Sequence, residues 1–378
     1  MNKMETYFAA VRYALNPEKG YPSGVESMDW DDFCEFCKRQ AVLGVVFRGV
    51  MAMKEGGVEV PRKLFMKWYS MTEKTLQKNQ TLNKRSVQIS EFFAKAGFRS
   101  CVLKGQGNAL MYPDPYSRTS GDIDLWVEGD RKAVTQLVKK YCPKSFEQYL
   151  HIDFPVFKDA LVEVHYTPGK ALSPFVNKRL QKYFTENISE QVNHRVSLPD
   201  GAGNISVPTD SFNVFYQMIH VMTHFFVEGV GLRHFIDYYY LLKKIGKDGC
   251  RQQDWSSLFR RYGMLRFVRG FMWVEQHVLG LEDCYLIVEP DEQRGRVILE
   301  EMLAGGNFGH YDERYEMRNK GVIARGLIDT YRLLRLTGVF PTESLWKIYR
   351  KIENQRWRLK MSRVLSSTSK SSSARSLG

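Results

Sequence analysis

Apolar side chains recur three or four residues apart at both ends of the chain, the spacing that places them on one face of a helix. Residues 1–95 follow this period, and residues 63–97 predict one or two long helices that end at Gly97. The helical period returns at Ser211, which we expect to cap a helix, and continues to about Arg363. Both ends of the chain are therefore expected to be helical.

The middle of the chain changes to the two-residue period of β-strands, with short helices between the strands. The expected strands cover residues 98–103, 121–128, 150–157 and 160–166, the expected helices residues 106–112 and 131–141, and a short hairpin residues 194–207. This order predicts an α+β protein, in which a small mixed sheet is flanked by helical regions. The expected regions are an N-terminal helical region at 1–95, an α/β core at 96–210, a C-terminal helical domain at 211–363 and a basic, Ser-rich tail at 364–378.

Two aspartates share one face of the strand expected at residues 121–128. Side chains alternate faces along a strand, so Asp122 and Asp124 point the same way, while Ile123 and Leu125 point towards a core. Two parallel carboxylates repel each other unless a cation lies between them. Mg²⁺ prefers such oxygen ligands, usually one or two carboxylates together with substrate phosphates. The pair therefore predicts a site for a hard divalent cation.

A glycine-containing turn precedes these aspartates. Gly105 and Gly107 follow a strand that ends at Lys104, with Gln106 between the two glycines. Glycine lets the backbone approach a ligand closely, and amide groups at the start of a helix can hold a phosphate. The turn predicts a phosphate cradle, and the alternative is an ordinary structural turn between strand and helix.

A third acid lies on the strand expected at residues 160–166. Glu163 and His165 share one face of this strand, and Val162 and Val164 share the other. If this strand lies beside the aspartate strand, it brings a third carboxylate to the pair. Three carboxylates can hold two Mg²⁺ ions, which clamp the attacking and leaving oxygens of an in-line displacement, and one acid can take the proton of the attacking hydroxyl.

Over roughly residues 96–245 the chain resembles the uncharacterised bacterial nucleotidyltransferase family within the DNA polymerase beta-like superfamily. The resemblance is carried by Leu103-Lys104-Gly105, Tyr112-Pro113, Arg118, Gly121–Val127 and Val162–Tyr166. It implies that Gly105 is the turn glycine, Asp122 and Asp124 are the metal-binding pair, and Glu163 is the third acid. His165 matches the histidine that commonly follows this acid. Two features depart from the superfamily pattern: Gln106 stands where many members have Ser, and the spacing from Gly105 to Asp122 is longer than usual.

The resemblance also implies a reaction. Such an enzyme moves an NMP group from an NTP to a hydroxyl of an acceptor and releases pyrophosphate, with Mg²⁺ or Mn²⁺ on the three acids Asp122, Asp124 and Glu163. The segment Gly229–Asp237 is similar to the family's Gly-x-Gly-Leu-Arg-x-x-x-Asp helix, which places Arg233 near the nucleotide or the acceptor. The expected nucleotide-binding residues are Lys104, Gly105, Gln106, Gly107, Arg118 and Arg233.

Several of these side chains also have a structural interpretation. Lys104 and Arg118 can equally form salt bridges. Arg233 and Asp237 are four residues apart on an expected helix, so they can pair and orient that helix.

Two other patterns are compatible with metal binding, and each has a simpler explanation. His220 and His224 have the four-residue spacing of a helical zinc site, but no His-Glu-x-x-His sequence is present. Cys34 and Cys37 form a Cys-x-x-Cys motif, but no second pair follows at zinc-ribbon spacing, so buried small hydrophobes are the simpler interpretation.

The positive charge of the chain is concentrated at its C-terminal end. The formal net charge is +13, and from Trp346 to Gly378 nine Lys or Arg residues stand against Glu353 alone. A basic helix and tail can bind nucleic acid or an anionic membrane surface. The alternative is a solvated helix face followed by a disordered Ser-rich segment at 366–378.

Composition excludes several classes of protein. A hydrophobic content of 43% with 26% charged residues is typical of soluble globular proteins. No apolar run approaches the roughly 20 residues of a membrane span. The first residues lack the apolar core of a signal peptide, so we expect a cytoplasmic protein. Six scattered cysteines are too few for a disulfide scaffold.

Three functions therefore remain open. The first is nucleotidyl transfer to an acceptor that is a protein, a small molecule, a saccharide or a nucleic acid. The second is a non-catalytic protein of the same fold that binds a nucleotide or a partner, which the missing Ser at position 106 favours. The third is nucleic-acid binding through the basic tail.

Overall fold

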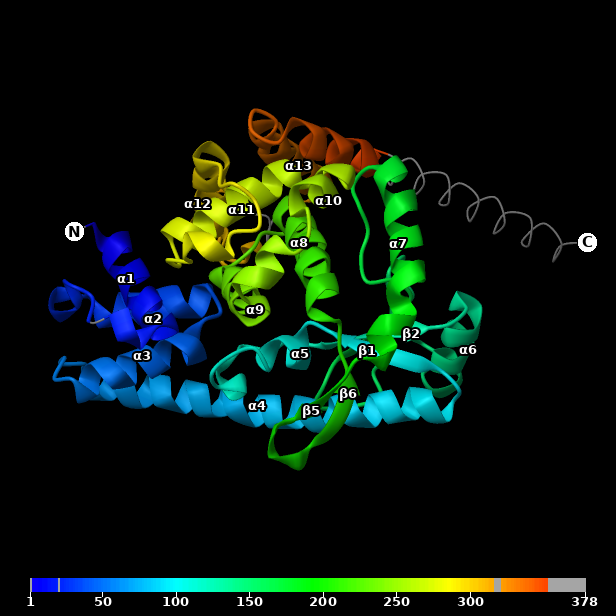
Figure 1. Cartoon of the computed structure of the whole chain (residues 1–378), viewed down its shortest axis with the longest axis horizontal. Coiled ribbons are helices and arrows are strands. Elements are labelled where there is room, and N and C mark those ends of the chain that lie inside the picture. The colour runs from blue at the N-terminus through cyan, green and yellow to red at the C-terminus, as the bar shows by residue number, and fades with distance from the viewer. Residues whose placement is uncertain (1, 20, 316–320, 353–378) are drawn as a thin grey trace, which may run out of the picture.

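The computed structural model describes residues 2–19, 21–315 and 321–352, which are mostly helical at both ends and mixed in the middle (Figure 1). The helices are α1 (Lys3–Leu15), α2 (Trp30–Arg39), α3 (Leu43–Glu55), α4 (Arg62–Lys95), α5 (Gly105–Ala109), α6 (Arg131–Tyr141), α7 (Pro174–Asn193), α8 (Asp210–Val227), α9 (Leu232–Arg251), α10 (Trp255–Arg261), α11 (Leu265–His277), α12 (Glu292–Gly305) and α13 (Val322–Leu336), and residues 341–352 are also helical. The strands are β1 (Arg99–Leu103), β2 (Ile123–Glu128), β3 (His151–Asp153), β4 (Val162–His165), β5 (Arg195–Leu198) and β6 (Gly203–Ser206). The predicted α+β class is confirmed, and the predicted tail at 364–378 lies outside the described residues.

Four strands form one mixed sheet in the order β1-β2-β4-β3, and β5 and β6 form a separate hairpin. β1 is antiparallel to β2, β2 is parallel to β4, and β3 is antiparallel to β4. Parallel neighbours need a crossover connection, which here includes α6 and β3. The register places Asp124 opposite Leu103 on one side and Glu163 on the other. The aspartate strand is therefore central, and the third acid lies on its neighbour as predicted.

The two faces of the sheet pack into different hydrophobic clusters. Ile123 and Leu125 belong to the smaller cluster, together with Phe93 of α4. On the other face, Trp126 stacks on Phe212 of α8 with ring centroids 5.8 Å apart, and both belong to the larger cluster, which also contains the helices at both ends of the chain. The alternation along β2 therefore turns its carboxylates towards the C-terminal helices.

The helix α4 is one continuous element of 34 residues, in agreement with the helix predicted over residues 63–97. Gly97 follows its end with a φ of +86°, a conformation that glycine adopts without strain. The buried side chain of Asn79 donates from Nδ2 to the backbone oxygens of Tyr116 at 3.0 Å and Arg118 at 2.8 Å. α4 thus fixes the loop that leads into β2.

Two predicted boundaries differ from the structure. The strand predicted at 150–157 shrinks to the three residues of β3, because Pro155 has no N–H group to continue the pairing. The helix expected to begin at Ser211 has Thr209 at its N-cap instead. Both the backbone N–H and the hydroxyl of Thr209 donate to Oε1 of Gln191, at 2.7 and 3.1 Å, which fixes the start of the helix two residues earlier.

The Cys-x-x-Cys motif lies on α2 and is buried. Cys34 is 5% exposed and Cys37 is fully buried, and burial raises the pKa of both thiols. Neither belongs to a group of side chains that could share a metal ion within the described residues. Packing in the hydrophobic core therefore explains the positions of the two cysteines. Among the helices described, none is both long and apolar enough to cross a membrane.

Glu275 of α11 leads to a prediction about stability. Its side chain is fully buried, neither carboxyl oxygen has a hydrogen-bond partner among the described residues, and burial raises its pKa well above the usual range. The carboxyl group therefore holds its proton more strongly in the folded chain than in the unfolded chain. As pH rises above about 4.3, the unfolded chain ionises and the free energy of unfolding falls, by up to about 1.4 kcal/mol per pH unit. Glu275→Met is therefore expected to raise the free energy of unfolding at pH 7.

Urea denaturation at pH 5 and pH 7 measures this effect. The advantage of the variant over the wild type should be larger at pH 7. The exposed Glu59 supplies the matched control, since Glu59→Met should change the stability by a similar small amount at both pH values. An equal gain for Glu275→Met at both pH values would show that ionisation of this carboxyl is not involved.

Candidate active site

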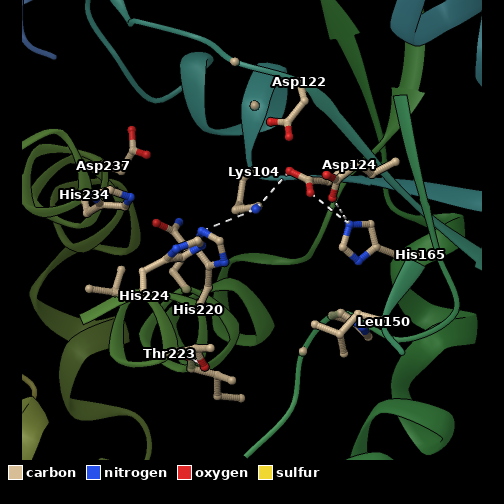
Figure 2. Close-up of a pocket in the computed structure, with 18 of the residues that line it drawn as sticks. Lys104, Asp122, Asp124, Leu150, His165, His220, Thr223, His224, His234 and Asp237 are labelled. Atoms are coloured by element: carbon tan, nitrogen blue, oxygen red, sulfur yellow. Dashed lines mark hydrogen bonds and ion pairs between the residues drawn. The ribbon is translucent and has the colours of Figure 1, made fainter. Parts of the chain in front are cut away.

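A pocket of about 710 Å³ lies between the acidic face of the sheet and the helices α8 and α9. Figure 2 shows Asp122, Asp124 and His165 on one side of it, the histidines of α8 and α9 on the other, and Lys104 between them. Pockets of roughly 300–1,000 Å³ are typical of small-molecule sites. The pocket is large enough for a nucleotide.

The three predicted acids meet at this pocket. Asp124 and Glu163 are register partners on β2 and β4, and Asp122 lies just before the first residue of β2. One carboxylate oxygen from each of the three residues lies within 4.8 Å of the other two. The sequence therefore placed these side chains on the correct face, and the parallel pairing brings them together.

Asp124 is the most strongly held of the three acids. Its Oδ2 lies 2.9 Å from Nζ of Lys104, and its Oδ1 accepts a hydrogen bond of 2.9 Å from Nε2 of His165. Burial alone would raise the pKa of Asp124, but Lys104 and His165 hold that pKa far below its usual range. Burial likewise opposes protonation of His165, yet its hydrogen bonds to Asp124 and Glu163 raise its pKa to about 9.

Asp122 has a different environment. Repulsion from Asp124, followed by burial, raises the pKa of Asp122. No ion pair to Asp122 comes from the described part of the chain, although the residue lines the pocket. A cluster of three carboxylates in which one lacks a cationic partner fits a hard divalent cation such as Mg²⁺ or Mn²⁺. Asp122, Asp124 and Glu163 are the residues that could hold it.

The glycine turn contributes less to the pocket than its sequence predicts. Lys104 has a φ of +50° and Gly105 a φ of +36°, and both line the pocket. Gln106 is buried, and its Nε2 donates to Oδ1 of Asn83 on α4. Gly107 packs against Val207, whose Cγ1 would lie 2.9 Å from any added Cβ. The expected nucleotide contact by the Gln106 side chain is thus not supported, because this side chain anchors the turn to α4.

Arg118 forms a buried ion pair instead of a free phosphate contact. Its Nε and Nη2 each donate to a carboxylate oxygen of Asp237 on α9 at 2.7 Å, and both side chains are less than one-tenth exposed. Tyr112 and Asn108 complete the hydrogen bonding of Asp237. The structural interpretation of Arg118 is therefore the one that the geometry favours, and the predicted Arg233–Asp237 pair is replaced by this longer-range pair.

Arg233 is instead directed to the pocket. Its Nη1 donates to the backbone oxygen of Thr119 at 2.9 Å, and its guanidinium lies 5.4 Å from the centre of the Phe308 ring. Its Nε is buried without a hydrogen bond, and the described residues give it no carboxylate partner. Burial and the neighbouring Arg118 lower the pKa of Arg233. A desolvated cation of this kind is suited to bind an anion.

The α8 histidines line the pocket but do not form the helical zinc site considered above. His220 contacts Nζ of Lys104 at 3.3 Å, and His224 pairs with Glu228 at 3.0 Å. Burial, followed by the charge of Lys104, lowers the pKa of His220 well below its usual range. The groups of described residues that could share a metal ion include none of these three side chains.

Sequence analysis missed His151, which lines the pocket beside Glu163. His151 is the register partner of His165 in the antiparallel pair β3 and β4. The sequence does contain a signal, because His151 lies in the strand that was predicted next to the strand of His165. Register partners on neighbouring strands point to the same face of the sheet, so His151 shares the face of His165. Without the register, the pairing could not be recognised.

Comparisons with known proteins identify the family of the chain. No curated protein matches the chain. A solved structure, an antigenic nucleotidyltransferase-like protein from Paracoccidioides brasiliensis, matches at 13% identity over 44% of this chain and 77% of that chain, with a TM-score of 0.29. The family model described as uncharacterised nucleotidyltransferase matches residues 26–280, more than half of the chain. The chain therefore belongs to this family of uncharacterised nucleotidyltransferases.

Proposed function

We propose that the protein is a metal-dependent nucleotidyltransferase that moves an NMP group from an NTP to a hydroxyl of an acceptor. The observation that carries the proposal is the group of three carboxylates, Asp122, Asp124 and Glu163, at the wall of a nucleotide-sized pocket. In the reaction an acceptor oxygen forms a bond to the α-phosphorus, the bond from that phosphorus to the bridging oxygen breaks, and pyrophosphate leaves with the electron pair.

The three acids would hold Mg²⁺ or Mn²⁺, and the bound ions would neutralise charge on the triphosphate. Glu163 is 30% exposed at its side chain and is the acid best placed to accept the proton of the acceptor hydroxyl. Lys104 lines the pocket with Nζ 2.9 Å from Asp124 and 3.3 Å from His220, so its ammonium group would lie beside a phosphate bound at the acids. Positioning and charge neutralisation supply most of the catalysis in this mechanism.

The pocket also carries positively charged side chains that could bind a polyanion. Arg233 and Lys170 line it together with the acids. Lys170 is exposed at the rim of the pocket, and its neighbourhood, including the nearby Arg350, lowers its pKa. A triphosphate that bridges the acids and these two cations would pair with both of them. It would also offset the free-energy cost of burying the Arg233 guanidinium.

Substitution of Arg233 tests this arrangement. Arg233→Gln removes the cation but keeps a donor, and is expected to weaken the binding of a non-hydrolysable NTP analogue by about 10-fold to 100-fold, the value of a charge-assisted hydrogen bond. Isothermal titration calorimetry with Mg²⁺ present measures the effect. Arg62→Gln is the matched control, because Arg62 is exposed and does not line the pocket. Equal affinities for the two variants would remove Arg233 from the nucleotide site.

The proposed activity is tested by Mg²⁺-dependent release of pyrophosphate. Each of the four NTPs is incubated with a panel of protein, small-molecule, saccharide and nucleic-acid acceptors, and labelled acceptor is analysed in parallel. Release that requires both the metal and an acceptor supports nucleotidyl transfer. NTP binding without release across the whole panel would contradict it and favour a non-catalytic nucleotide-binding protein.

A further inference from the structure

We infer that His151, Glu163 and His165 form a binding site for a first-row transition-metal ion such as Zn²⁺, beside the all-carboxylate site and sharing Glu163 with it. The inference goes beyond the proposed function, because it assigns an imidazole-containing site that the transfer reaction does not require. It concerns metal binding alone, so it can be tested independently of nucleotidyl transfer.

The geometry of the three side chains carries the inference. β3 and β4 are antiparallel with His151 opposite His165, which places both imidazoles beside the Glu163 carboxylate. Oε2 of Glu163 lies 3.2 Å from Nδ1 of His151 and 3.3 Å from Nε2 of His165. Ligand atoms held at about 2.0–2.1 Å from a tetrahedral zinc are roughly 3.3 Å apart. The two measured separations are therefore those of ligands around one ion, and an ion bound to Nε2 of His165 would replace the hydrogen bond from this nitrogen to Asp124.

The hydrogen bonding of the imidazoles is a second, independent observation. Both ring nitrogens of His151 and Nδ1 of His165 are buried and make no well-directed hydrogen bond in the described part of the chain, although the His151 nitrogens lie 3.2 Å from Glu163 and 3.5 Å from Asp153. The side chain of His165 is only 7% exposed and that of His151 only 12%. Buried polar atoms are nearly always paired, so unpaired nitrogens at a pocket wall call for a ligand that the chain itself does not supply. A metal ion supplies a partner for Nδ1 of His151, the unpaired nitrogen that faces Glu163.

The donor set distinguishes this site from its neighbour. Imidazole nitrogen suits Zn²⁺ and related transition metals, whereas carboxylate oxygens alone suit Mg²⁺. Two histidines and one glutamate are also a set that leaves a coordination position open in catalytic zinc sites. All three side chains line the pocket, so that position would be accessible to a bound ligand.

Titration with Co²⁺ tests the inference, because Co²⁺ with nitrogen ligands gives visible absorption bands and Mg²⁺ gives none. The wild-type chain is expected to bind Co²⁺ with these bands in the presence of millimolar Mg²⁺. His151→Gln should weaken Co²⁺ binding by at least about 10-fold to 100-fold, the range found even for residues that only support metal ligands. Asp122→Asn, which alters only the carboxylate site, should retain the bands.

Three results would overturn the inference: no visible bands with the wild type, unchanged Co²⁺ binding by His151→Gln, or loss of the bands in Asp122→Asn alone. Wild-type crystals soaked in Zn²⁺ provide a measurement that does not depend on the folding of a variant. An anomalous peak between His151, Glu163 and His165 supports the site, and a peak only between the aspartates contradicts it. Because neither readout involves nucleotide, failure of the proposed transfer reaction would leave this result intact.

Discussion

Arg118→Met is expected to lower the free energy of unfolding by about 3–5 kcal/mol, the usual cost of removing one partner from a buried ion pair. Arg118 and Asp237 pair through two hydrogen bonds of 2.7 Å, and their side chains are 5% and 7% exposed. Without the guanidinium, the carboxylate of Asp237 is left buried with only Tyr112 and Asn108 as partners. Two neutral donors cannot replace a bidentate cation in a desolvated site.

Urea denaturation of three variants measures this pair. Arg118→Met/Asp237→Leu should recover part of the loss, because neither charge is then buried alone. Arg85→Met is the matched control: Arg85 also pairs with an aspartate, Asp159, but that pair is partly exposed and should contribute about 0–1 kcal/mol. If the double variant is no more stable than Arg118→Met, an unpaired carboxylate is not the source of the loss.

The ion pair also explains where sequence reasoning about the site failed. Arg233 and Asp237 are four residues apart, so a local pair was one of the two interpretations that the sequence left open, beside a contact of Arg233 with the nucleotide or acceptor. In the structure the carboxylate is bound by Arg118, which is 119 residues away in the chain. The bidentate geometry and burial of this pair outweigh the few tenths of a kcal/mol available to a helical i, i+4 pair. Arg233 is thereby left free to face the pocket.

The acidic group, in contrast, was largely predictable. Strict alternation along the aspartate strand fixed the face of Asp122 and Asp124, and the same rule fixed Glu163. What alternation cannot supply is the register between strands, because a shift of two residues keeps every side chain on its face. The parallel register of Asp124 with Glu163 and the antiparallel register of His151 with His165 needed the structure.

The helix α7 was not predicted at all, although one end of it packs beside β2 (Figure 1). Ser173 caps it and Pro174 occupies its first turn, a combination that marks the start of a helix. Its apolar residues Val176, Leu180, Phe184, Ile188 and Val192 recur every four residues and lie in or against the larger cluster, so the helical period was present in the sequence and was overlooked. This apolar face packs on the sheet, where Phe184 of α7 meets Trp126 of β2 edge to face with ring centroids 6.1 Å apart.

Asp122→Asn is expected to reduce the rate of pyrophosphate release by at least about 10³-fold without lowering the melting temperature, because it removes a charge that acts on the reacting groups. Repulsion from Asp124 and burial raise the pKa of Asp122 in the folded chain. An acid with a raised pKa contributes stability that is lost as pH rises from its unfolded value, so at pH 7 its carboxylate opposes folding. An amide of the same shape relieves this repulsion, and the melting temperature should stay the same or rise.

The choice of Asp122 over Asp124 makes this test decisive. Asp124 is bound by Lys104 and His165, so its replacement removes an ion pair from each of these two side chains and confounds stability with activity. Asp153→Asn is the matched control, since Asp153 lies on the same sheet but does not line the pocket, and it should retain full turnover. Turnover with the acceptor that the panel identifies is measured beside thermal unfolding at pH 7. Persistent turnover in Asp122→Asn would show that the acids do not bind the catalytic metal, and a parallel fall in melting temperature would show that their role is structural.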